Sequence, residues 1–229
     1  LIMEKVACDL GEAICDATER LGYSNIVLAG WSGGGSLMMW YQALAEAGAG
    51  ISDTAAGDPY TVAASRLPAA SSIIMMAAHV SRHRIFTEWL DPSISDESQP
   101  NLRDAQLNLY DAGNPNQPPY SADFLERFAQ AQVARNRRIT AWVKEKLAVI
   151  RSSDSPWSEF AFTVHGTMAD PRWLDPSIEP SDRKAGSCYL GDPQIVNDGP
   201  VGLARFCTLR SWLSQWSYDD ARCDAIASG

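Results

Sequence analysis

The sequence has few basic side chains: among its 229 residues, 19 Lys and Arg stand against 28 Asp and Glu, which gives a net charge of -9. No basic run occurs, so the clustered cations that release counterions from a phosphate backbone are missing, and we expect no nucleic-acid partner. There is also no run of about eighteen apolar residues, so we expect no membrane span. The apolar fraction is ample for a globular core.

No metal-ligand pattern is present. The five cysteines form no C-x-x-C pair and have no histidine at zinc-ligand spacing, so we expect neither a metal nor another cofactor. Cys8 and Cys15 share a helical face and are expected in the core. The odd count without a disulfide framework favours a reducing, cytoplasmic location. No signal peptide is visible, but Leu1 opens directly into helical periodicity, so we expect the true N-terminus to lie upstream.

Three elements are predicted over the first 48 residues, in the order helix, strand, helix. Apolar residues recur at helical spacing from Val6 to Leu21, and Gly22 suits the end of a helix. The run Ile26–Ala29 predicts a strand buried on both faces. The composition of residues 37–47 predicts a helix that stops at Gly48.

A second strand is predicted further along. Residues 49–71 carry turn signals and are expected to form a loop, and residues 72–77 form another buried apolar strand. Sequential parallel strands with a crossover helix indicate the α/β class, with a mostly parallel sheet.

The sheet signal disappears after residue 80. Apolar residues at helical spacing predict a long amphipathic helix over 121–150, and residues 152–199 are rich in turn formers around a short strand at 160–164. A final helix is expected over 203–216. We expect these basic residues on or near the solvated side of the long helix: Arg135, Arg137, Arg138, Lys144 and Lys146.

One hexapeptide occurs twice, as Trp89–Ile94 and as Trp173–Ile178, with the sequence Trp-Leu-Asp-Pro-Ser-Ile. The surroundings do not repeat. We interpret it as the same turn chemistry used twice, with Asp-Pro opening a turn and Trp-Leu packing beneath it. A shared binding role is the alternative.

The pentapeptide from Gly30 to Gly34 matches G-x-S-x-G, with a predicted strand before it and a helix after it. In this arrangement Ser32 sits on a strained turn, so that its hydroxyl projects as a nucleophile, and we expect bulk at Gly30 or Gly34 to break the turn. The N–H of Gly33, at the positive end of the following helix, is a candidate oxyanion donor. Trp31 completes the motif.

Two other interpretations of this turn remain. It can be a tight connection without chemistry, or it can bind phosphate at a helix N-terminus. The second is disfavoured because neither G-x-x-x-x-G-K-[ST] nor G-x-G-x-x-G is present.

A serine nucleophile needs a base, and the chain has only three histidines. His79 ends the second predicted strand, at the same sheet edge as Ser32, and is a possible pocket residue. His83 is expected at the surface. His165 is a candidate base by its late position, but no strand-and-helix pattern follows it. We therefore expect the acid and the base to lie outside this sequence.

The segment from Gly30 to Gly35, with its flanking strand and helix, resembles the α/β-hydrolase fold superfamily. The helical insertion resembles the caps of its capped members, and the segment from Gly202 to Ser217 is similar to the return from cap to core. The resemblance implies a partial hydrolase core at residues 1–80, a mainly helical cap at 81–200 and a return segment at 201–229. It also implies a Ser-His-Asp triad, of which only Ser32 and the oxyanion donor Gly33 have counterparts here.

We expect a serine hydrolase that cleaves an ester or similar acyl bond through an acyl-enzyme on Ser32. Amide or lactone hydrolysis, acyl transfer, and a non-catalytic binding module on the same fold are the alternatives. The expected partner is a small, hydrophobic acyl substrate. Candidate pocket residues, each also a candidate for the core, are Phe86, Trp89, Met168, Trp173, Trp212 and Trp216.

Overall fold

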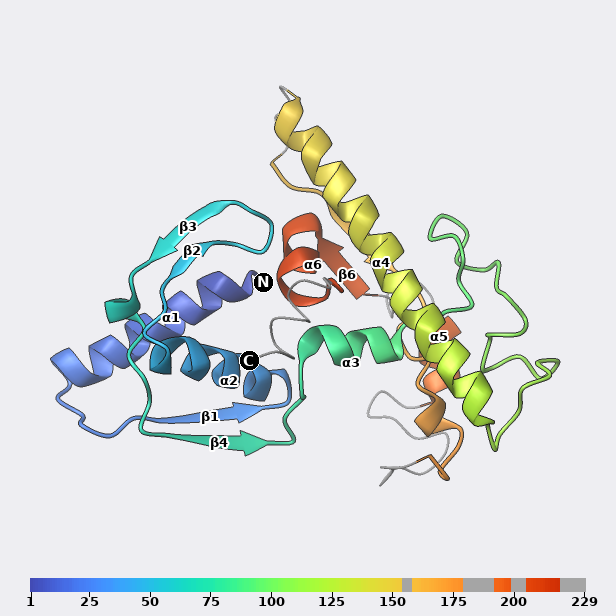
Figure 1. Ribbon diagram of the computed structural model, residues 1–229, viewed down its shortest axis with the longest axis horizontal. Coiled ribbons are helices and arrows are strands. Elements are labelled where there is room, and N and C mark those ends of the chain that lie inside the picture. The colour runs from blue at the N-terminus through green and yellow to red at the C-terminus, as the bar shows by residue number, and fades with distance from the viewer. Residues whose placement is uncertain (154–157, 179–191, 199–204, 219–229) are drawn as a thin grey trace. The chain divides into compact units, whose positions relative to one another are not determined.

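The computed structural model describes residues 1–153, 158–178, 192–198 and 205–218. Helices and strands are mixed along the chain (Figure 1), so the predicted α/β class is confirmed at this coarse level. The chain divides into two compact units, Leu1–Ile85 with Arg210–Trp216 and Phe86–Leu209 with Ser217–Gly229. The G-x-S-x-G motif lies in the first unit.

The first unit begins with α1 (Met3–Cys15), which continues into a π-helical turn, η1 (Asp16–Arg20). The predicted helix is confirmed, and Gly22 has a positive φ of 75°. The buried face is rotated from the predicted one, because Leu21 is exposed while Ala7 is fully buried.

Two parallel strands and a helix follow in this unit. β1 (Val27–Trp31) pairs in parallel with β4 (Ser72–Met76), and α2 (Gly33–Glu46) packs against them (Figure 1). The predicted order and the parallel pairing are confirmed. Burial on both faces is wrong, because buried and exposed residues alternate along β1 and β4 has no fully buried residue. Among the described residues, this parallel sheet has two strands.

The segment between α2 and β4 contains a β-hairpin, where the sequence predicted only a loop. β2 (Ile51–Asp53) pairs antiparallel with β3 (Pro59–Val62), and a 3-10 turn, η2 (Ala64–Arg66), follows. Ile51 and Val62 are partners across the hairpin, and both are buried. The strands have only 3 and 4 residues, too few for an alternating pattern to be recognised.

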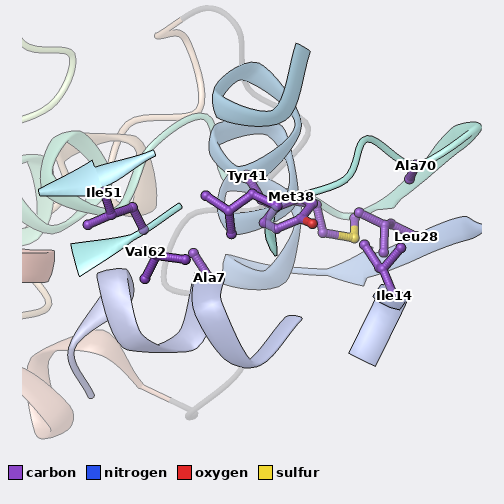
Figure 2. Packing of buried hydrophobic residues seen from close by; sticks show 9 residues of the cluster. Ala7, Ile14, Leu28, Met38, Tyr41, Ile51, Val62 and Ala70 are labelled. Carbon is purple, nitrogen blue, oxygen red and sulfur yellow. The ribbon is translucent and has the colours of Figure 1, made fainter. Parts of the chain in front are cut away.

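One hydrophobic core holds these elements together. Figure 2 shows Met38 and Tyr41 of α2 in the same cluster as Leu28 of β1, while Ala7 of α1 lies beside the hairpin. Burial raises the pKa of Tyr41 to about 12. Its hydroxyl donates to the carbonyl of Pro68 at 2.8 Å. This bond ties the chain that leads into β4 to α2.

The last described helix, α6 (Leu209–Gln215), contributes most of its residues to the first unit. The hydroxyl of Ser214 donates to the buried carboxylate of Glu4 at 2.7 Å, and Arg210 forms an ion pair with Asp58 at 2.6 Å. Residues from near the two ends of the sequence therefore belong to one packed unit.

The second unit contains the long helix α4 (Ala122–Ser152), which confirms the helix predicted over 121–150. Ser121 caps it by accepting the N–H of Phe124 at 3.2 Å. A shorter helix, α3 (Arg82–Trp89), precedes it and begins in the first unit. Apolar side chains buried along α4 are Phe124, Phe128, Ile139, Val143 and Leu147.

Arg135 of α4 is fully buried, which contradicts its predicted position on the solvated side. Its guanidinium forms a two-bond ion pair with Glu97 at 2.8 and 2.7 Å. It also donates to the carbonyls of Asp91, His165 and Gly166. Side chain and backbone acceptors from distant segments thus compensate the buried charge, and spacing along one helix could not reveal them. The other basic residues are exposed as predicted: Arg137, Arg138, Lys144 and Lys146.

We expect Arg135→Met to lower the free energy of unfolding by about 3–5 kcal/mol, because it leaves a carboxylate and three carbonyls without their donor. Arg137→Met, two residues along on the exposed side of α4, is the matched control and should change the free energy of unfolding by about 0.5 kcal/mol or less. Urea denaturation followed by tryptophan fluorescence compares the two. Equal effects of both variants would contradict a structural role for the buried guanidinium.

The second unit also contains an antiparallel strand pair. β5 (Ala161–Val164) confirms the short strand predicted there, and it pairs with β6 (Arg205–Thr208). Two short helices, η3 (Pro171–Trp173) and α5 (Pro193–Asp198), lie between them in sequence. The sequence predicted a final helix over 203–216, and Leu203 lies outside the described residues. The first residues of this segment that the structure describes form the strand β6 instead, because they pair with β5.

The two hexapeptide copies form the same turn. In each, the Asp carboxylate accepts the N–H and the hydroxyl of the Ser two residues later, at 2.9 and 2.5 Å in the first copy and 3.0 and 2.6 Å in the second. The rings of Trp89 and Trp173 pack together with centroids 5.4 Å apart. The predicted reuse of one turn chemistry, with tryptophan beneath, is confirmed.

None of the helices in the described part of the chain combines the length and the apolar character that crossing a membrane requires. The thiols of Cys8, Cys15 and Cys207 are free, with Cys15 buried and Cys8 partly buried. Burial raises the pKa of the Cys207 thiol to about 11. Cys188 and Cys223 lie outside the described residues.

Candidate active site

Ser32 stands between the last residue of β1 and the first residue of α2, on the turn where the G-x-S-x-G pattern puts it. Its backbone has φ 55° and ψ -121°. An L-residue rarely adopts such angles, and a conformation of this kind costs on the order of 1–3 kcal/mol. It persists only where the surrounding structure holds it.

Backbone hydrogen bonds hold this turn on both sides. The N–H of Ser32 donates to the carbonyl of Met76 at 3.0 Å, and the carbonyl of Ser32 accepts the N–H of His79 at 3.1 Å and that of Gly35 at 3.1 Å. The chain after β4 is itself bent, since Ala77 has a positive φ of 44°. Hydrogen bonds between the residues that follow β1 and the end of β4 therefore stabilise the conformation of both turns.

His79 lies against the side chain of Ser32. Its Nε2 atom is 3.2 Å from the Ser32 hydroxyl oxygen, within hydrogen-bond distance. The register of the strands explains the contact, because Trp31 of β1 pairs with Met76 of β4 and the residues that follow each strand meet. The sequence predicts His79 at this edge as a possible pocket residue, and the structure brings it into direct contact with the candidate nucleophile.

Gly33 begins α2, so its N–H belongs to the first turn, whose amides have no partner within the helix. The helix dipole adds positive charge at the same point. The N–H of Gly33 thus remains the candidate oxyanion donor that the sequence indicated. Among the described residues, no group of three or more His, Cys, Asp or Glu side chains is placed to hold a metal ion.

Close contacts explain two of the glycines around Ser32. A Cβ on Gly30 would lie 2.7 Å from the backbone carbonyl of Gly34, and a Cβ on Gly35 would lie 2.3 Å from the Cβ of Ala78. A Cβ on Gly34 would meet nothing within 4 Å. The prediction that a larger side chain disrupts the turn is therefore supported at Gly30, where a Cβ would clash with the backbone. At Gly34 the prediction is wrong for a methyl group, which would meet no atom within 4 Å. Gly35 is the second position where a side chain would clash, because it packs against Ala78 in the turn after β4.

We expect Ser32→Gly to be more stable than Ser32→Ala by about 1 kcal/mol, because glycine adopts a positive φ without strain. At an ordinary position the order is reversed, since glycine costs about 0.5–1 kcal/mol relative to alanine. Thermal unfolding of the two variants measures the difference. An alanine variant that is the more stable of the two would show that the turn at Ser32 is not strained.

The other two histidines have contacts of their own. The Nδ1 atom of His83 is 3.2 Å from the hydroxyl of Ser81, and His83 is partly buried rather than at the surface. His165 belongs to the second unit, where its carbonyl accepts a hydrogen bond from Arg135.

Most of the candidate pocket side chains are core side chains. Trp31 of the motif is 72% exposed. Trp216 is partly buried. The other proposed pocket side chains are buried: Phe86, Trp89, Met168, Trp173 and Trp212.

Arg82 is a neighbour of the motif that no sequence pattern indicates. Its Nη2 atom would lie 2.6 Å from a Cβ on Gly33. Its Nη1 atom donates to Gln215 at 3.3 Å, and its Cζ atom lies 5.3 Å from the ring centroid of Trp216. Only the folded chain brings these positions together, so sequence spacing held no signal for them.

Comparisons of the chain with protein-family models, with curated proteins and with solved structures returned no match.

Proposed function

We propose that this chain is a serine hydrolase of the α/β-hydrolase kind, which cleaves an ester through an acyl-enzyme on Ser32. The observation that carries the proposal is the Ser32 turn, where a strained backbone presents a hydroxyl 3.2 Å from His79 Nε2. Strain of this size is stored at functional sites more than elsewhere. A turn that served only as a connection would have no need of it.

The contacts of Ser32 support a specific order of proton transfer. As the Ser32 oxygen attacks the ester carbonyl, its proton passes to Nε2 of His79, and the carbonyl oxygen becomes an oxyanion beside the N–H of Gly33. The carbon–oxygen bond to the leaving alcohol then breaks, and His79 returns the proton to that oxygen. Water repeats the sequence on the acyl-enzyme, which releases the acid and restores the Ser32 hydroxyl.

The arrangement of the first unit supports the same family. A parallel strand, a tight turn with the serine, a helix and a second parallel strand follow in that order. Residues 81–200 are the proposed cap, and a small, hydrophobic acyl compound is the proposed partner. Amide and lactone hydrolysis and acyl transfer would use the same acyl-enzyme, and a turnover panel separates them.

The acyl-enzyme can be observed directly. We expect the protein, mixed with 4-nitrophenyl acetate and quenched in acid, to carry one acetyl group on the peptide that contains Ser32. The exposed Ser24, in the same unit, is the internal control and should stay unmodified. An acetyl group on another side chain, or no adduct with any activated ester, would overturn the proposal and favour a binding module.

A further inference from the structure

We propose that two copies of this chain form a two-fold symmetric dimer through the face of the β1–β4 sheet opposite α2. The alternation of side chains along β1 defines the two faces. Leu28 is buried in the same cluster as Met38 of α2, and a Cβ on Gly30 would clash with the Met38 side chain. The other residues of β1 therefore point away from α2. The proposal does not depend on the chemistry at Ser32.

The face opposite α2, called the open face below, carries large apolar side chains that are exposed. Residues paired in register share a face, and so do alternate residues along each strand. Trp31 of β1 is paired with Met76 of β4. Neither strand contains a charged residue. The large side chains of the open face, with their exposed fractions, are Val27 (52%), Trp31 (72%), Ile74 (51%) and Met76 (45%).

The open face has the area of an interface core. In the part of the chain that the structure describes, this parallel sheet exposes one face, although parallel sheets occur almost only where both faces are covered. Its four large side chains leave roughly 400 Å² of apolar surface exposed, at about 150–250 Å² for each side chain in full. Each copy in a standard interface buries about 800 Å², with an apolar core inside a polar rim. The open face therefore supplies about half of the area that a stable dimer needs.

The charge of the chain favours a second copy over a lipid surface as the occupant of this face. Proteins that lie on membranes combine apolar side chains with Lys and Arg, because the lipid surface is anionic. This chain has a net charge of -9, and its two strands contain no basic residue. An uncharged face lets two equally acidic copies meet without placing like charges opposite each other. Two such faces can pack about 10 Å apart, as sheets do in two-layer proteins, and the two-fold axis closes the assembly.

Sedimentation velocity at micromolar concentration tests the dimer. We expect the wild type to sediment as a dimer. Ile74→Glu should raise the dissociation constant at least about 100-fold, because the dimer would bury two carboxylates without partners. Since Ile74 is exposed within one copy, this variant should keep the far-UV circular dichroism spectrum of the wild type. Met39 of α2 is 48% exposed and lies outside the open face, so Met39→Glu is the matched control and should change the dissociation constant less than about threefold.

Cross-linking locates the interface by a second route, and it decides alone if Ile74→Glu loses the wild-type spectrum. Ala29→Cys places a thiol in the middle of β1 on the open face, and a bismaleimide that spans about 10 Å, the spacing of packed sheets, should join two copies. Ser24→Cys, at an exposed position before β1, should cross-link no more than the unsubstituted chain with its own five cysteines.

A monomeric wild type would overturn the inference, because another molecule or another part of this chain would then cover the open face. A dimer that a folded Ile74→Glu leaves intact, or that Ala29→Cys does not cross-link above the Ser24→Cys control, would also overturn it by assigning the contact to a different surface.

Discussion

Ser32→Ala is expected to lower kcat for ester hydrolysis by about 10⁴-fold or more, the loss that follows removal of a catalytic nucleophile. The expectation follows from the strained backbone at Ser32, which places this hydroxyl 3.2 Å from His79 Nε2. A steady-state assay with 4-nitrophenyl acetate measures the change.

The control for Ser32→Ala lies four residues further along the chain, in the first turn of α2. Ser36 donates its hydroxyl to the carbonyl of Gly33 at 3.1 Å, so Ser36→Ala disturbs the first turn of α2 without touching the proposed nucleophile. It should retain activity within about threefold, a free-energy change below 1 kcal/mol. A Ser32→Ala variant that keeps a tenth or more of the wild-type rate would mean that another group attacks the ester.

His79→Ala is expected to lower kcat/KM by about 10²- to 10⁴-fold, the contribution of a general base. Because the variant leaves a space beside the Ser32 hydroxyl, added imidazole should restore part of the activity in His79→Ala and none in Ser32→Ala. A merely structural histidine would not be replaced by a small base from solution, so rescue separates the two roles.

His83→Ala serves as the control for the histidine experiment. His83 lies four residues along the chain, and its Nδ1 atom is 3.2 Å from the hydroxyl of Ser81. We expect its activity to stay within about threefold of wild type. Full activity of His79→Ala would show that the base is a different group, as the family resemblance implies with its late histidine.

The helices and strands that could be predicted are those determined by residues close together in the sequence. The strand before Ser32 and the helix after it follow from an apolar run and from helix formers bounded by Gly48, and α4 follows from its periodic apolar residues. The hairpin could not be predicted, since its two short strands are held by burial of Ile51 and Val62 in a core assembled from distant segments.

The sequence predicts the serine, the glycine after it and the nearby histidine of the candidate site, but it does not predict the arginine beside them. The motif identifies Ser32 and Gly33, and parallel pairing brings His79 to the same edge. Arg82 reaches Gly33 with the help of Gln215, more than a hundred residues later in the chain, a contact that no spacing rule encodes. The burial of Arg135 in the second unit could not be predicted for the same reason, because its hydrogen-bond acceptors come from separate loops.

Labelling with a fluorescent fluorophosphonate tests the central claim most directly, because this reagent reacts with an activated serine hydroxyl and needs no knowledge of the substrate. The account predicts that the wild-type protein is labelled at one site and that the label is lost in Ser32→Ala while Ser36→Ala retains it. An unlabelled wild type, or equal labelling of Ser32→Ala, would contradict the proposal that the strained turn carries a catalytic nucleophile.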